Sequence, residues 1–366
     1  MDFELPADTL MLRDMLRRFV RKEAQPLEMK YFTAGQLTPE ERARLQRAVE
    51  QMGLWGLTVP EAYGGGLDLV SACVLDEELG QTFIPVEIGE VPAVLYACSG
   101  DQVGSYLEPA LAGERRSVMA AREPGRLKPE MWITTAQLVA DSYILNGQKI
   151  LSVATQTDDF LVVYARAEQG PTAFMLDVRC PGMDISANGE VTLTLAGCQA
   201  EASAILGQPG EALALGAGEA PKAWIRSGAR YVGASTRLLE MAAEHARSWV
   251  SLGEPLSIRP AIQRMLAEMQ VDIESARWLV YRAAWLAESG AKEDLRIAAA
   301  RVRLATGEML QRSVDRATMI FAGPGPSPQI EPQRFVRSLA PPETLEFALQ
   351  QARAVIAASL LAGTTD

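Results

Sequence analysis

The chain has 366 residues, 48% of them hydrophobic and 22% charged, which is enough apolar sequence for a globular protein of two or three packed units. Its formal net charge of −11 argues against a nucleic-acid partner and against an anionic membrane surface, because both attract clustered lysines and arginines. No run of about eighteen apolar residues occurs, so the sequence predicts no membrane span.

The cysteines are too scattered to suggest a metal site. They are Cys73, Cys98, Cys180 and Cys198. None forms a Cys-x-x-Cys pair, and only His245 could add a nitrogen ligand, so we expect no metal centre. Residues 1–22 lack the basic start and apolar run of a signal peptide, so we expect a cytoplasmic protein whose cysteines stay reduced.

The first part of the chain has helical signals. Residues 7–110 carry apolar side chains near helical spacing. Thr38 predicts a helix start, because it is a good cap and is followed by Pro39 and two glutamates that favour the positive end of the helix dipole. The glycines and the proline of residues 59–66 predict a loop. We therefore assign a helical domain to residues 1–116.

Short strands replace the helices in the middle of the chain. The strands that we expect lie at residues 160–165, 172–178 and 191–195. Asn146 and Gly147 predict a hairpin turn, because both positions of such a turn favour positive φ angles. Short strands separated by proline and glycine are typical of a barrel-like β domain, which we assign to residues 117–216.

The helical pattern returns near Pro221. Apolar residues from Ile262 to Ala283 keep a three-four spacing over several turns, which is typical of a core stripe or a helix–helix contact rather than a cofactor site. We assign a helical domain to residues 217–366 and interpret the stripe as a natural face for assembly. The predicted fold class is therefore mainly α with a central β domain.

Several motifs stand in an order that resembles the acyl-CoA dehydrogenases. They are residues 53–65, 76–80, 143–149, 253–256 and 276–281. That resemblance implies an N-terminal helical domain, a middle β-barrel-like domain and a C-terminal four-helix bundle. It also implies α,β-desaturation of an acyl-CoA thioester, in which a carboxylate removes a proton and FAD accepts a hydride.

The resemblance places the catalytic base at Glu346. The family's glutamate follows an arginine by nine positions, as Glu346 follows Arg337, and Arg353 falls where the family also has an arginine. Phe347 stands where the family has a glycine that allows close approach to the flavin. Glu343 is the alternative base if the motif is shifted by three positions.

The same segment has a second interpretation as a helix beginning. Proline is tolerated in a first turn, and glutamates there favour the positive end of the dipole, so Glu346 would then serve the helix rather than the reaction. The family's second position for a base falls at Ala223, which has no acidic group.

The resemblance also places the flavin contacts. They fall at Arg122, Leu151, Ser152, Val153, Met319, Gly323 and Gly325. Several of these positions depart from the family pattern: Arg122 and Val153 replace threonines, and Met319 replaces a glutamine. In the segment that faces a partner in the family, Trp249 replaces an arginine. Each lost hydrogen bond to a charged group weakens binding, so we expect FAD to be held weakly or shared with a partner subunit.

Three functional hypotheses stay open. The chain is a self-sufficient acyl-CoA dehydrogenase, or a degenerate subunit of a heterotetramer of two unlike family chains, or a relative with altered thioester chemistry. The last of these would need new polar groups, for which Arg122 and Arg126 are the candidates. All three predict an acyl-CoA ligand, and the first two predict a homo- or hetero-oligomer.

Overall fold

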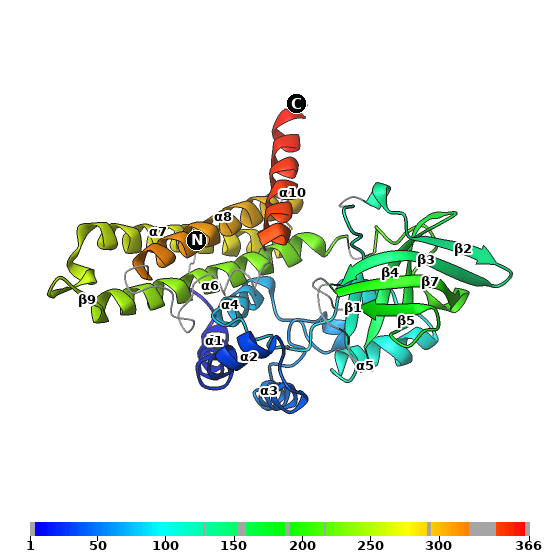
Figure 1. Cartoon of the computed structure of the whole chain (residues 1–366), viewed down its shortest axis with the longest axis horizontal. Helices are drawn as coiled ribbons and strands as arrows, with labels where there is room; N and C mark the ends of the chain where they lie inside the picture. The colour runs from blue at the N-terminus through cyan, green and yellow to red at the C-terminus, as the bar shows by residue number, and fades with distance from the viewer. Residues whose placement is uncertain are drawn as a thin grey trace. The chain divides into compact units, whose positions relative to one another are not determined.

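The computed structural model describes residues 4–126, 129–151, 155, 159–186, 191–215, 217–290, 294–321 and 342–362. Its contacts divide the chain into two compact units, one made of Met1–Ile88 with Pro221–Asp366 and the other of Gly89–Ala220. The helical, β, helical order of elements confirms the predicted fold class (Figure 1). The division of the helical parts into two separate domains stays a prediction.

The first unit begins with four α-helices. They are α1 (Ala7–Phe19), α2 (Glu28–Ala34), α3 (Pro39–Gln51) and α4 (Leu69–Leu79). The Thr38 hydroxyl accepts the N–H of Glu41, and the Glu41 carboxylate accepts the N–H of Thr38, which confirms the predicted helix start. The loop predicted at residues 59–66 is also confirmed, apart from a short 3₁₀ turn at Glu61–Tyr63.

Long helices complete this unit. They are α6 (Ala220–Ser248), α7 (Pro260–Glu288), α8 (Leu295–Phe321) and α10 (Pro342–Leu361), with a small hairpin of β9 (Val250–Ser251) and β10 (Glu254–Pro255). The α7 stripe predicted between Ile262 and Ala283 is buried against α6 and α8. It is therefore core of this chain, and the interpretation of it as an assembly face is wrong.

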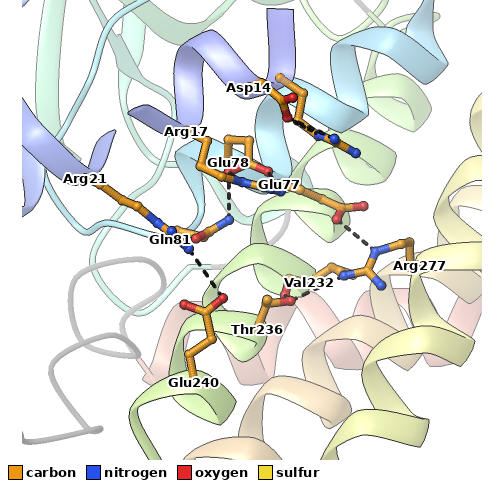
Figure 2. Close-up of polar contacts among 11 residues, drawn as sticks. Asp14, Arg17, Arg21, Glu77, Glu78, Gln81, Val232, Thr236, Glu240 and Arg277 are labelled. Carbon is orange, nitrogen blue, oxygen red and sulfur yellow. Dashed lines mark hydrogen bonds and ion pairs between the residues drawn. The ribbon is translucent and has the colours of Figure 1, made fainter. Parts of the chain in front are cut away.

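Three consecutive acids of α4, residues 76–78, tie the helices of this unit together. Because successive residues of a helix point about 100° apart, each acid meets a different neighbour. Asp76 accepts hydrogen bonds from Arg226 (2.6 Å) and Arg230 (2.8 Å) of α6, Glu77 from Arg277 (2.9 Å) of α7, and Glu78 from Arg17 (2.6 Å) of α1. Figure 2 shows Glu77 with Arg277 of α7 and Glu78 beside Arg17 of α1.

The second unit contains α5 (Glu108–Leu111) and a mixed, mainly antiparallel sheet. Its strands are β1 (Ser117–Ala120), β2 (Thr135–Val139), β3 (Ser142–Leu151), β4 (Phe160–Ala167), β5 (Gly170–Asp177), β6 (Met183–Ser186), β7 (Val191–Glu201) and β8 (Ile205–Leu206). The strand order is β6-β7-β3-β2-β4-β5-β8, with β1 parallel to β4. The three strands expected from the sequence correspond to β4, β5 and the first part of β7.

The predicted hairpin turn at Asn146 and Gly147 is wrong. Strand β3 runs through both residues, and the turn lies at Ala140, whose φ is +54°. Gly147 serves a different purpose, since its φ is +146° and an added Cβ would lie 2.5 Å from Thr134 Oγ1. A glycine is therefore needed for close approach rather than for a turn, and the register with β7 shifts between Leu145 and Asn146.

Candidate functional site

Glu346 lies near the N-terminal end of α10 with its side chain half-exposed. Its Oε1 accepts hydrogen bonds from Gln350 Nε2 (2.8 Å) and from Arg353 (3.1 Å), both on the same helix. Arg353 also donates to Glu308 Oε1 on α8 at 3.1 Å, so one guanidinium orients two carboxylates. Within the described part of the chain, both of these hydrogen bonds fall on Oε1 and none on Oε2.

The helix that carries Glu346 is anchored by its neighbours. Leu345 and Leu349 are fully buried and pack with Leu304 and Tyr231. The helix begins at Pro342, which confirms the predicted helix beginning. The side chains of Glu343 and Phe347 lie outside the described residues, so the structure does not choose between Glu346 and the shifted alternative.

The β unit contains a buried ion pair that sequence reasoning missed. Lys149 Nζ lies 3.0 Å from Glu123 Oε1, and neither side chain is exposed. Glu123 also accepts the N–H groups of Ile133 (2.8 Å) and Thr134 (2.9 Å), and the Lys149 ammonium lies 4.3 Å from the centre of the Trp132 ring. Lys149 lies in one of the family-like motifs, residues 143–149, but no pattern in the sequence links it to Glu123.

This pair lies beside two of the predicted flavin positions. The Arg122 carbonyl accepts the N–H of Ile150 at 2.9 Å, so the structure brings Arg122 next to Leu151. The Arg122 side chain is exposed, whereas Leu151 points into the core of the sheet and offers a ligand only its backbone. Ser152 and Val153 lie outside the described residues.

The C-terminal ends of α6 and α8 form a second feature, an aromatic cluster. The His245 ring stacks on Trp249 with centres 5.7 Å apart and planes 17° apart, and it contacts Phe321 at 4.4 Å. Met319, one of the predicted flavin positions, is 59% exposed on α8. Gly323 and Gly325 lie outside the described residues.

A hollow of about 830 Å³ opens beside this cluster and is lined by arginines as well as by aromatic rings. Its lining includes Arg21, Arg237, His245 and Phe321. Arg237 Nε and His245 Nε2 are buried and find no hydrogen-bond partner among the described residues, which is unusual for such strong polar groups. Burial also lowers the pKa of His245, which favours its neutral form.

The described part of the chain offers neither a metal site nor a membrane span. Among the described residues, no cluster of three or more His, Cys, Asp and Glu side chains has an arrangement suited to a metal ion. No helix in the same part of the chain combines the length and low polarity that a membrane span needs.

Comparisons with known proteins agree with this architecture. Residues 6–114 match the family model described as acyl-CoA dehydrogenase, N-terminal domain, and residues 225–361 match that of the C-terminal domain. The (R)-benzylsuccinyl-CoA dehydrogenase of Thauera aromatica is 29% identical over 395 residues, which cover 99% of this chain and 97% of the relative.

Two further relatives extend the comparison. The human mitochondrial short-chain specific acyl-CoA dehydrogenase is 27% identical, with 98% of this chain and 91% of that protein covered. A solved structure of glutaryl-coenzyme A dehydrogenase with glutaryl-CoA has a TM-score of 0.85 and 26% identity, and the match covers 99% of this chain and 97% of that one. With its fold and both terminal domains matched, this chain belongs to the acyl-CoA dehydrogenase family.

Proposed function

We propose that the chain takes part in the α,β-desaturation of an acyl-CoA thioester, with Glu346 as the base that removes the proton next to the thioester carbonyl. The observation that supports this role best is the Glu346 carboxylate itself, because two donors orient its Oε1 while the side chain stays half-exposed. A base must be oriented and reachable, and this arrangement meets both needs. Family membership supports the substrate class.

FAD is the cofactor that the family implies, and it would supply the hydride acceptor. The described residues fit it only in part. Among the described residues, the Arg237 Nε donor and the polar His245 Nε2 have no partner and lie beside an aromatic cluster, which suits a nucleotide. Met319, in contrast, presents a thioether that cannot donate a hydrogen bond. We therefore propose that this chain alone holds FAD weakly, or that it shares FAD with a partner subunit.

A second candidate is a subunit that supports the reaction of an unlike family chain without supplying the base. One face of α7 favours assembly of this kind, because Val271, Trp278 and Trp285 are 64%, 42% and 58% exposed. They recur every seven residues and therefore lie close to one line along the helix. Exposed tryptophans aligned on one face are typical of protein interfaces.

The Glu346→Gln substitution tests the proposal and separates the two candidates. We expect the wild-type chain, alone or co-expressed with a second family member, to exchange the proton next to the carbonyl of acyl-CoA thioesters in D₂O. The variant should lose this exchange by at least about a hundredfold, since a general base contributes about 10²–10⁴-fold. A panel containing butyryl-CoA, glutaryl-CoA and benzylsuccinyl-CoA provides the substrates, and mass spectrometry measures the deuterium.

Glu308→Gln is the matched control, because Glu308 binds the same arginine, Arg353, and is similarly exposed. It should keep exchange within a few-fold of wild type. If Glu346→Gln keeps full exchange in the complex, the base belongs to the partner and the second candidate is correct. If neither the chain nor its complex exchanges any substrate of the panel, the proposed reaction is wrong.

A further inference from the structure

Two of the cysteines of the β unit lie side by side although 18 positions separate them. Cys180 Sγ and Cys198 Sγ are 3.0 Å apart. Cys180 lies in the turn after β5, and Cys198 lies in β7 opposite Leu145 of β3. We propose that these two thiols are an oxidation site of the protein and form a reversible disulfide with peroxide-class oxidants. The proposal does not depend on the proposed function.

The backbone brings the two segments together independently of the sulfur atoms. The N–H of Ala196 donates to the carbonyl of Gly182 at 2.8 Å, which fixes the turn against β7. Gly182 has a φ of +81°, and an added Cβ would lie 2.8 Å from the carbonyl oxygen of Ala196 and 3.0 Å from the N of Cys198. The turn around Gly182 therefore packs so closely on β7 that a larger residue would not fit at position 182. This packing places Cys180 beside Cys198.

The two thiols differ in the way that a stepwise oxidation needs. Cys180 is partly exposed and can meet a small oxidant, whereas Cys198 is fully buried. Burial, with the neighbouring Cys180 thiol, raises the pKa of Cys198 to about 12, so it stays a thiol until it reacts. Cys180 is thus the attacking residue and Cys198 the resolving one.

The chemistry balances with one peroxide molecule. The Cys180 thiolate attacks a peroxide oxygen, the O–O bond breaks and hydroxide leaves, which gives a sulfenic acid. The Cys198 sulfur then attacks the Cys180 sulfur, the S–O bond breaks, and the hydroxyl leaves as water with the Cys198 thiol proton. Two electrons have passed from the thiols to the peroxide, and a dithiol reductant reverses the change.

The other two cysteines provide internal controls. Cys73 is buried in α4, where burial raises its pKa well above the ordinary value. Cys98 has a methionine sulfur, Met175 Sδ, at 3.8 Å, and a thioether cannot form a disulfide. Peroxide should therefore link Cys180 to Cys198 and leave the other two thiols free for alkylation.

The experiment uses the full chain, reduced and then treated with a small excess of hydrogen peroxide. The intact mass should fall by about 2 Da, because two thiol hydrogens are lost. Peptide mapping without reduction should show the Cys180 and Cys198 peptides joined. The thermal midpoint should rise by roughly 3–8 °C and return on reduction, since the bond closes a short loop that contains the edge strand β6.

The Cys198→Ser variant should lose the linked peptide and leave Cys180 trapped as a sulfenic acid, which dimedone labels. Cys98→Ser should behave as wild type. Wild-type mapping decides the matter even if the Cys198 variant folds poorly. If all four thiols of the treated wild type are still alkylated, or if the linked peptides contain Cys73 or Cys98, the proposal is wrong.

Discussion

Glu123 and Lys149 carry opposite charges inside the β unit, where neither side chain reaches solvent. Lys149→Met would keep most of the side-chain length and leave the Glu123 carboxylate buried without its cation. We expect the free energy of unfolding to fall by about 3–5 kcal/mol, as when one partner of a buried pair is removed. Urea titration measures the loss, and the double variant with Glu123→Gln should recover part of it. Equal midpoints for wild type and Lys149→Met would contradict this role.

The same pair predicts a pH dependence of stability. Burial opposes ionisation of Glu123, but hydrogen bonds from Thr134, Ile133 and Lys149 outweigh it, so its pKa is lowered from the ordinary 4.5. The unfolded chain therefore takes up the proton first as pH falls. The stabilisation is present above pH 4.5 and is lost as pH drops through the lower folded value. Urea midpoints of Glu123→Gln should depend less on pH below 4.5 than those of wild type, with exposed Asp141→Asn as the control.

At the scale of single residues, the sequence identifies residues that belong to a motif. It is much less able to identify the side chains that those residues bind. Glu346 was proposed as the base because its distance from Arg337 resembles the family pattern. Its contact with Gln350 follows from helical spacing, but the sharing of Arg353 with Glu308 of α8 does not. The link between Glu123 and Lys149 joins positions 26 apart, and no local rule predicts it.

At the scale of elements, the periodic signals were reliable and the turn signal was not. The α7 stripe was predicted as core or a helix–helix contact, and its burial confirms the helical spacing, although its interpretation as an assembly face was wrong. The turn at Asn146 and Gly147 was wrong because β3 pairs with β7 over its whole length, and with β2 as far as Asn146. Pairing with two neighbours outweighs the conformational preference of two residues.

The acids of α4 give a prediction at this scale. Asp76 is completely buried and binds two arginines of α6, so Asp76→Asn would remove the charge that both need. We expect a loss of about 3 kcal/mol in the free energy of unfolding, because the arginines are only partly buried and water can reach them. Asp14→Asn, on the exposed part of α1, should leave the urea midpoint unchanged. If the urea midpoint of Asp76→Asn equals that of wild type, the contact between Asp76 and the arginines of α6 does not stabilise the fold.

For the whole molecule, the exposed α7 face predicts assembly. Replacing Trp278 and Trp285 together by glutamate should convert an oligomer into smaller species, because charges would enter an apolar contact. Light scattering after size exclusion gives the mass, and circular dichroism checks that the fold is kept. Met11→Glu, which changes another exposed apolar residue, should not alter the mass. If wild type is a monomer with and without a second family chain, the assembly prediction is wrong.

The three adjacent acids of α4 also bear on how such a chain can change over evolutionary time. A side chain that faces a ligand can be replaced alone, with consequences for that ligand only. The three acids of α4 cannot be replaced alone without wider consequences. Each replacement would leave an arginine on a different helix without its carboxylate partner, namely Asp76 for α6, Glu77 for α7 and Glu78 for α1. Single substitutions can therefore remove catalytic and binding groups one at a time. At these contacts between helices, in contrast, the acid and its arginine have to change together. A lineage under such constraints would lose its reaction long before it lost its shape.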